Sequence, residues 1–239
     1  MIKGKNILIT GGTTGIGRAT AKILAGKGAN VFIFGRHQLE LDNAISEIQR
    51  VGNIIGITAD VTKPDNVKNI YKLFDEKLGI IDVLINNASL AARGILDYDL
   101  HYIEYLVKTN ILGYMLNSKY AIERMKKNGR GHIINIGSLS AEFYDENAEL
   151  YVATKSAIRG FNNSLRKSVN QMNIKVALIE PGSVGTDLID EKPREQRRLE
   201  NEMRMLRAED IGDAIAYILA LPERCDMMLM QIKPHFQLI

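Results

Sequence analysis

Short apolar runs alternate with longer amphipathic stretches along almost the whole chain. The runs are rich in β-branched residues and lack strict apolar–polar alternation, which is typical of strands buried on both faces. They cover residues 6–10, 31–34, 54–58, 82–86, 132–137, 174–180 and, more weakly, 228–232. The stretches between them repeat apolar positions with a helical period near 15–27, 38–50, 65–78, 100–127, 151–171 and 208–220.

This regular order of strand and helix predicts the α/β fold class. Right-handed crossovers through the helices give a doubly wound, Rossmann-type parallel sheet of about seven strands. The sequence contains no repeat and no Pro/Gly-rich linker, so we expect a single domain over residues 1–239. Residues 183–207 follow the sixth strand and show the weakest pattern. We expect them to form a substrate lid at the carboxyl end of that strand.

The composition excludes several classes of partner. The net charge of +3 gives no reason to expect nucleic acid, and the basic stretch 192–207 lacks interleaved aromatic residues, so it indicates a solvated helix face. The four histidines lack the spacing of metal ligands. No apolar run is long enough to span a membrane, and the single cysteine, Cys225, fits a reducing compartment. We therefore expect a cytoplasmic protein without metal, membrane or nucleic-acid contacts.

The strand at 6–10 runs into a glycine-rich turn at 11–17, with the sequence GGTTGIG, and a helix follows. Glycine permits a close approach of the backbone to a phosphate, and the helix N-terminus offers free N–H groups to it. A glycine cluster by itself is also compatible with an ordinary turn. The order of strand, turn and helix favours a dinucleotide site, whereas the lack of a following Lys–Ser/Thr pair disfavours an ATP-type loop.

Tyr151 and Lys155 are four residues apart in a predicted helix, so their side chains share one face. A neighbouring ammonium stabilises the phenolate, so we expect Lys155 to lower the pKa of Tyr151 from its usual value of about 10. Taken alone, such a pair more often means a tyrosine at the edge of the core and a solvated lysine. The glycine-rich turn and Ser138, thirteen residues before Tyr151, favour a proton donor and acceptor instead.

In its motifs, the sequence resembles the short-chain dehydrogenase/reductase family over almost the whole chain. The matching residues, in chain order, are Thr10-Gly11 with Gly15-Ile16-Gly17 (TGxxxGxG), Asp60-Val61, Asn86-Asn87-Ala88 (NNAG), Asn110, Ser138, Tyr151 with Lys155 (YxxxK), and Pro181-Gly182 with Thr186. The resemblance implies an oxidoreductase that interconverts a small-molecule carbonyl and a secondary alcohol by hydride transfer with a nicotinamide cofactor.

The resemblance also implies roles for individual residues. Tyr151 would protonate the carbonyl oxygen in reduction or take the hydroxyl proton in oxidation, and Ser138 would orient the same oxygen. Lys155 would bind the nicotinamide ribose and tune Tyr151. Asn110 would hold a water that links Lys155 to solvent; the alternative is a polar residue bonded within its own helix. The cofactor contacts implied are Gly11, Thr13, Thr14, Gly15, Ile16, Gly17, Arg36, Asp60, Val61, Asn87, Ala88, Tyr151, Lys155, Pro181, Gly182 and Thr186.

Three further features bear on this comparison. Ser89 stands where the family has the glycine of NNAG, and we expect a small serine to be tolerated there. The stretch 227–234 is methionine-rich instead of glycine-rich, and its methionines are typical of a core or an interface. The helix at 100–127 carries more apolar residues than one stripe needs. By resemblance, it would pair with the helix at 151–171 across a two-fold axis, giving a homodimer or homotetramer.

The end of the second strand predicts the cofactor. NAD enzymes place an acid there to bind the ribose 2′-hydroxyl, whereas this chain has Gly35 followed by Arg36. A guanidinium can bind a 2′-phosphate through two hydrogen bonds, and Arg18 could add a second cation. We therefore expect NADP, with NAD less favoured. The alternative is that Arg36 is an ordinary surface arginine and the enzyme accepts both cofactors.

Other classes explain less of the sequence. A non-catalytic nucleotide-binding sensor on the same fold is the main alternative, because fold does not fix function. The presence of Tyr151 and Lys155 disfavours it. A methyltransferase on a similar sheet would not explain why Ser138, Tyr151 and Lys155 occur together.

Overall fold

Seven parallel strands form the central sheet, in the order β3-β2-β1-β4-β5-β6-β9. In this computed structural model, which describes residues 2–189 and 191–238, the strands are β1 (Asn6–Thr10), β2 (Asn30–Gly35), β3 (Asn53–Thr58), β4 (Val83–Asn86), β5 (Gly131–Ile136), β6 (Ile174–Pro181) and β9 (Leu229–Ile232). The predicted doubly wound sheet is therefore confirmed. Its order reverses between β1 and β4, and ligands of such sheets bind at the carboxyl ends beside the reversal.

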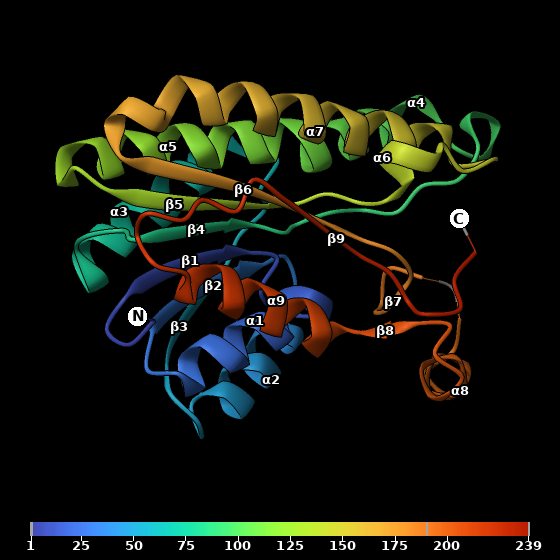
Figure 1. Cartoon of the computed structure of the whole chain (residues 1–239), viewed down its shortest axis with the longest axis horizontal. Coiled ribbons are helices and arrows are strands. Elements are labelled where there is room, and N and C mark those ends of the chain that lie inside the picture. Colours follow the sequence, from blue (N-terminus) through green and yellow to red (C-terminus); the bar gives the residue numbers. More distant parts are fainter. Residues whose placement is uncertain (1, 190, 239) are drawn as a thin grey trace.

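Helices cover both faces of the sheet (Figure 1). One face packs against α1 (Gly15–Gly26), α2 (Gln38–Ile48) and α9 (Ala208–Ala220), and the other against α3 (Pro64–Leu78), α5 (Gly113–Asn128) and α7 (Glu149–Val169). Strand β1 shows why the apolar runs do not alternate: Ile7 and Ile9 enter the first core and Leu8 the second. Within the described residues, no helix is long and apolar enough to cross a membrane.

The expected helix at 100–127 is divided into three parts. α4 (Leu100–Val107) leads into a π-helical segment, η2 (Lys108–Leu112), before α5 begins. The buried Asn110 lies in η2, and its amide bonds the backbone of Leu90 outside the helix. Four large apolar side chains on this stretch, Leu100, Val107, Leu112 and Met115, are exposed. They agree with the predicted surplus of apolar residues, and the assembly itself stays a prediction.

The segment 183–207 contains a short strand pair that its pattern did not indicate, and a helix where the basic stretch indicated a solvated helix face. β7 (Val184–Gly185) pairs with β8 (Leu206–Arg207), and α8 (Pro193–Asn201) lies between them. α8 buries none of its described side chains, and its sequence accordingly lacks the apolar stripe of a helix that packs on a core. Figure 1 shows all three at one edge of the molecule. The remaining short elements are η1 (Ile95–Asp97), α6 (Ser140–Phe143) and η3 (Asn170–Met172).

A buried ion pair ties α7 to the end of β6. Glu180 is fully buried, and its two carboxylate oxygens accept from Nε and Nη2 of Arg159 at 2.7 and 2.6 Å. Nη1 of Arg159 also pairs with Glu142 of α6 at 2.7 Å, and Gln231 of β9 donates to Glu180 at 2.9 Å. The cluster therefore joins four elements immediately beside the carboxyl edge of the sheet.

Replacing Arg159 should destabilise the protein strongly, because Glu180 would keep a buried charge without its cation. We expect Arg159→Ala to lower the free energy of unfolding by about 3 kcal/mol. Arg198 is a matched control, since it also binds two carboxylates, Glu195 and Glu202, but on the exposed helix α8. Arg198→Ala should leave it almost unchanged, because exposed ion pairs contribute little to stability. Equal losses in urea unfolding of the two variants would contradict the assignment.

Candidate active site

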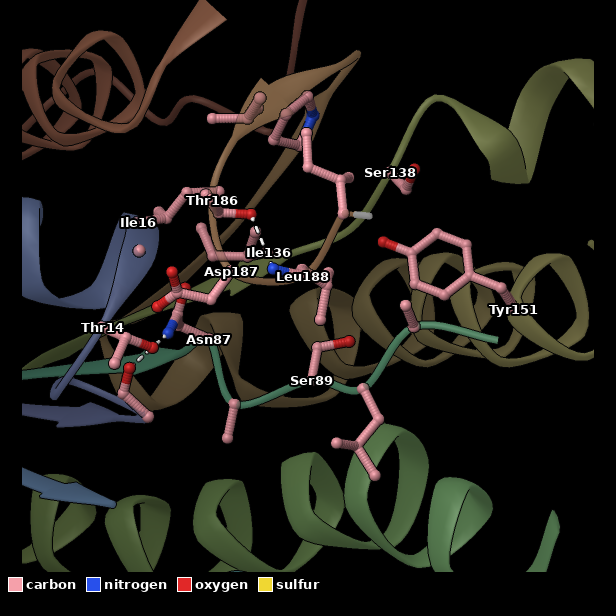
Figure 2. A pocket seen from close by; sticks show the side chains of 18 of the residues that line it. Thr14, Ile16, Asn87, Ser89, Ile136, Ser138, Tyr151, Thr186, Asp187 and Leu188 are labelled. Atoms are coloured by element: carbon pink, nitrogen blue, oxygen red, sulfur yellow. Dashed lines mark hydrogen bonds between the residues drawn. The ribbon is translucent and has the colours of Figure 1, made fainter. Parts of the chain in front are cut away.

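A cavity of about 770 Å³ opens at the carboxyl edge of the sheet. Six strands contribute to its wall through the residues at or just beyond their ends: Gly11, Gly35, Ala59, Asn87, Ser138 and Pro181. The loops that follow these strands complete it, and Figure 2 shows side chains from several of them pointing into one space. The parallel topology thus gathers residues that are far apart in sequence.

The glycine-rich turn forms the floor at one end of this cavity. Gly11 and Gly15 have positive φ angles of 62° and 50°, which other residues rarely adopt. A Cβ on Gly17 would overlap the carbonyl oxygen of Gly11, so Gly17 allows the turn to close on itself. Thr14 precedes the first turn of α1 and places no side-chain cap on it. The N–H groups at the start of α1 are therefore available to an anion.

Asn87 fastens the loop after β4 to the glycine-rich turn. Its amide nitrogen donates to the carbonyl oxygens of Thr10 and Gly11 at 3.0 and 2.9 Å. The Thr10 hydroxyl accepts in return from the backbone N–H groups of Asn87 and Ala88, both at 2.9 Å. Asn87 lines the cavity, but its amide nitrogen is committed to holding the turn in place.

Ser138, Tyr151 and Lys155 lie together at the other end of the cavity. Figure 2 shows the Tyr151 hydroxyl pointing into the cavity with Ser138 beside it. The Ser138 hydroxyl donates to Oγ of Ser140 at 3.1 Å and accepts from the Ser140 N–H at 3.2 Å. Lys155 is 2% exposed, donates to the carbonyl oxygen of Ile136 at 3.1 Å, and lies 5.4 Å from the centre of the Tyr151 ring. The spacing on α7 therefore presents both side chains to one space.

The pKa expectation for Tyr151 was wrong for the protein without ligand. Burial desolvates the phenolate and raises the pKa of Tyr151 to about 12; the Ser138 hydroxyl acts in the opposite direction but less strongly. Burial also lowers the pKa of Lys155 to about 7, because an ammonium loses its hydration there. The sequence showed that a cation stands near the phenol, but not that both groups are buried.

Three of the predicted site residues do not line the cavity: Gly17, Asp60 and Asn110. Gly17 packs within the turn, and Asp60 lies beside its wall. The amide of Asn110 is occupied by the backbone of Leu90, accepting from its N–H at 2.8 Å and donating to its carbonyl at 2.9 Å. These contacts leave its helix, so the alternative of a residue bonded within its own helix was wrong.

Arg18, considered as a second cation for a phosphate, faces elsewhere. Its Nε donates to Oε2 of Glu47 at 2.8 Å, and the guanidinium does not line the cavity. Arg36 does line it, at the end of β2. A Cβ on Gly35 would overlap the Thr13 side chain, so the fold has no room for an acid at position 35. Arg36→Ala is therefore a cleaner test of cofactor choice than Gly35→Asp.

Comparison with known proteins decides the family. Residues 5–197 match the family model described as short chain dehydrogenase. The chain belongs to the short-chain dehydrogenase/reductase family. An uncharacterized oxidoreductase of Staphylococcus epidermidis (strain RP62A) is 30% identical over 235 residues, covering 98% of each chain.

Solved structures share the fold. A 3-ketoacyl-(acyl-carrier-protein) reductase from Brucella melitensis complexed with NADH has a TM-score of 0.89 at 24% identity, with both chains covered completely. An actinorhodin polyketide ketoreductase variant with NADPH has a TM-score of 0.87 at 23% identity, covering 98% of this chain and 97% of that one. The protein is thus an oxidoreductase of the short-chain dehydrogenase/reductase family with the fold that its motifs indicated.

In this short-chain dehydrogenase/reductase, part of the cavity wall consists of residues that none of the sequence motifs includes. Apolar residues from the loops after β4, β5 and β6 line the cavity, among them the six residues Leu90, Ala92, Leu139, Phe143, Leu188 and Ile189. Gln237 also lines the cavity, and its Oε1 accepts from the Ser183 N–H at 3.0 Å. Loop residues that meet a helix or the far end of the chain leave no periodic pattern. Only the Ser-x-Ser spacing of Ser138 and Ser140 could have indicated locally that Ser140 also belongs to the cavity wall.

The buried Lys155 makes stability depend on pH in a direction that can be checked. Because folding lowers its pKa from 10.5 to about 7, the folded state binds fewer protons between these values. The wild type therefore gains stability as pH rises above about 7, with a limiting slope of about 1.4 kcal/mol per pH unit. We expect Lys155→Met to have the higher Tm at pH 6, and this advantage to shrink by pH 9. A Tm difference that stays constant from pH 6 to pH 9 would refute the buried ammonium.

Proposed function

We propose that this protein is an NADP(H)-dependent oxidoreductase that interconverts a carbonyl and a secondary alcohol by hydride transfer, with Tyr151 as the proton donor and acceptor. The observation that carries the proposal is the shared cavity: the hydroxyl-bearing Ser138 and Tyr151 line the same space as the glycine-rich turn. Family membership supports it, as do two proteins of similar fold, which were solved with NADH and NADPH.

The residues around the cavity fit a nicotinamide dinucleotide. The glycine-rich turn and the N-terminus of α1 supply backbone donors for a pyrophosphate. Oγ of Ser89 is buried on the cavity wall and has no hydrogen-bond partner in the described part of the chain. Buried hydroxyls are normally paired, so Ser89 is a ready donor for the cofactor. The serine that departs from the NNAG pattern therefore fits the site.

The predicted contacts assign each part of the cofactor to different residues along the cavity. Residues of the glycine-rich turn would hold the pyrophosphate, Arg36 the 2′-phosphate, and Val61 the adenine. Lys155 would hold the ribose hydroxyls at the other end, beside Tyr151. When bound, the cofactor supplies or accepts a hydride at its nicotinamide ring.

The protein's own groups handle the proton. With a pKa of about 12, Tyr151 is protonated at neutral pH and can donate its phenolic proton to a carbonyl oxygen. Ser138, held by its contacts with Ser140, hydrogen-bonds the same oxygen and orients it. Protonation of Lys155 beside the phenol stabilises the phenolate that remains. Asn110 fixes the backbone of Leu90 on the cavity wall, and the water relay through Asn110 is part of this proposal.

The cavity wall favours a substrate with uncharged, apolar groups on its carbonyl carbon. Besides the six apolar residues, it carries the carboxylate of Asp145, which raises the pKa of Tyr151 and would repel an anionic substrate. The cations of the proposed lid at 183–207 do not line the cavity; Arg198, for example, pairs with Glu195 and Glu202. Uncharged ketones are therefore the first substrates to assay.

Removing the phenolic hydroxyl should abolish turnover. We expect Tyr151→Phe to lower kcat/KM for ketone reduction by at least about 100-fold while NADPH still binds, because only the proton donor is lost. Lys155→Ala should weaken both turnover and binding. Tyr217→Phe, at an exposed tyrosine of α9, is the matched control. Wild-type turnover in Tyr151→Phe would refute the mechanism. A wild-type protein that binds NADPH but oxidises it with no ketone would favour the alternative of a non-catalytic nucleotide-binding sensor.

Removing the guanidinium should change the cofactor preference. We expect the wild type to favour NADPH over NADH by about tenfold or more in kcat/KM, since a charge-assisted hydrogen bond contributes roughly 1.5–3 kcal/mol. Arg36→Ala should remove most of this preference by raising the KM for NADPH. Lys22→Ala is a suitable control, because Lys22 pairs with Glu47 on the surface. A wild type that favours NADH would show that the end of β2 was misinterpreted.

A further inference from the structure

Arg36 is the donor end of a hydrogen-bonded chain that reaches across to α4. Its Nη1 donates to the Tyr105 hydroxyl at 2.8 Å, and that hydroxyl donates to Oδ2 of Asp60 at 2.9 Å. A guanidinium can only donate and an ionised carboxylate can only accept, so the direction of both bonds is fixed. The Tyr105 hydroxyl is thus satisfied on both sides, as acceptor and as donor.

The far end of this chain is firmly anchored. Oδ1 of Asp60 accepts from the N–H and the hydroxyl of Thr62, both at 2.8 Å, and the Asp60 N–H donates to Asn66 at 3.0 Å. These donors, with Tyr105, outweigh the effect of burial and hold the pKa of Asp60 below its usual value. The Tyr105 hydroxyl therefore meets a fixed, charged acceptor, and its own position is fixed in turn.

The near end of the hydrogen-bonded chain is the long side chain of Arg36, which the bond to Tyr105 restrains. Arg36 is exposed, lines the cavity and forms no ion pair within the described residues. Its Cζ lies 5.5 Å from the centre of the Tyr105 ring, within cation–π range. The hydrogen bond to Tyr105 occupies one of its five N–H donors, so the others remain able to bind a phosphate.

We propose that Tyr105 is a specificity-determining positioning residue: it holds the Arg36 guanidinium where a 2′-phosphate of the adenosine ribose would bind. The inference rests on the proposed preference for NADP(H). A flexible arginine loses rotamer freedom when it binds a phosphate, whereas an arginine already held by a tyrosine has less to lose. The effect of Tyr105 is therefore confined to ligands that carry the 2′-phosphate.

The phenylalanine variant isolates the hydroxyl, because Tyr105→Phe keeps the ring and its cation–π contact. Isothermal titration calorimetry with adenosine 2′,5′-bisphosphate and 5′-AMP compares two probes that differ only in the 2′-phosphate. We expect Tyr105→Phe to raise the Kd for the bisphosphate about fivefold, the worth of one hydrogen bond, and to leave the Kd for 5′-AMP unchanged. Any change at Asp60 acts on the adenosine common to both probes and cancels in their ratio.

Tyr102→Phe is the matched control on the same helix, because the Tyr102 hydroxyl donates to the carbonyl oxygen of Ala91 at 2.7 Å and, in the described part of the chain, the side-chain hydrogen bond of Arg36 goes to Tyr105 instead. It should leave the ratio of the two Kd values unchanged. One contradicting result is a wild type that prefers the bisphosphate while Tyr105→Phe keeps the full preference; another is a Tyr105→Phe variant that binds both probes more weakly by the same factor. Either result would overturn the role of Tyr105 and leave the NADP(H) preference standing. A wild type that binds the two probes equally would overturn the NADP(H) preference and, with it, this inference.

Discussion

The parallel backbone pairing of the strands is the constraint on which the site depends. β1 pairs with both β2 and β4, and β5 pairs with both β4 and β6, each in parallel register. Their carboxyl ends therefore reach the same edge of the sheet, where the turn after β1 lines one cavity together with Asn87, Ser138 and Pro181. A slip of one residue in any pairing would turn that strand's side chains to the opposite face and disrupt both cores.

Buried polar contacts then fix the loops beyond the strands. The Thr10–Asn87 contacts join the ends of β1 and β4, and the Arg159–Glu180 pair fastens α7 to the end of β6. Tyr151 and Lys155 precede Arg159 on α7, so the same ion pair helps to hold them against the cavity. Burial of this region sets their protonation, keeping the phenol neutral and lowering the pKa of the ammonium.

Local pattern predicted the fold, and the motifs named many of the residues that line the cavity, whereas contacts between distant segments were beyond both. β1 has the predicted bounds, and β2 extends the predicted run by one residue at each end, because strands buried on both faces leave continuous apolar runs. The helix expected at 100–127 is interrupted at η2, where Asn110 bonds the distant Leu90, and no local period encodes such a contact. The partner of Arg36 was missed for the same reason, since Tyr105 lies 69 positions further along the chain.

We propose that a hydride passes directly from the cofactor to a carbonyl carbon in this cavity. It can be tested with NADPH deuterated at the transferable position of the nicotinamide ring, an uncharged ketone that the enzyme reduces, and mass spectrometry of the product. The account predicts that the deuterium is found on the carbinol carbon of the alcohol, with a proton from solvent on its oxygen. Alcohol without deuterium on that carbon, or oxidised cofactor without alcohol, would contradict it.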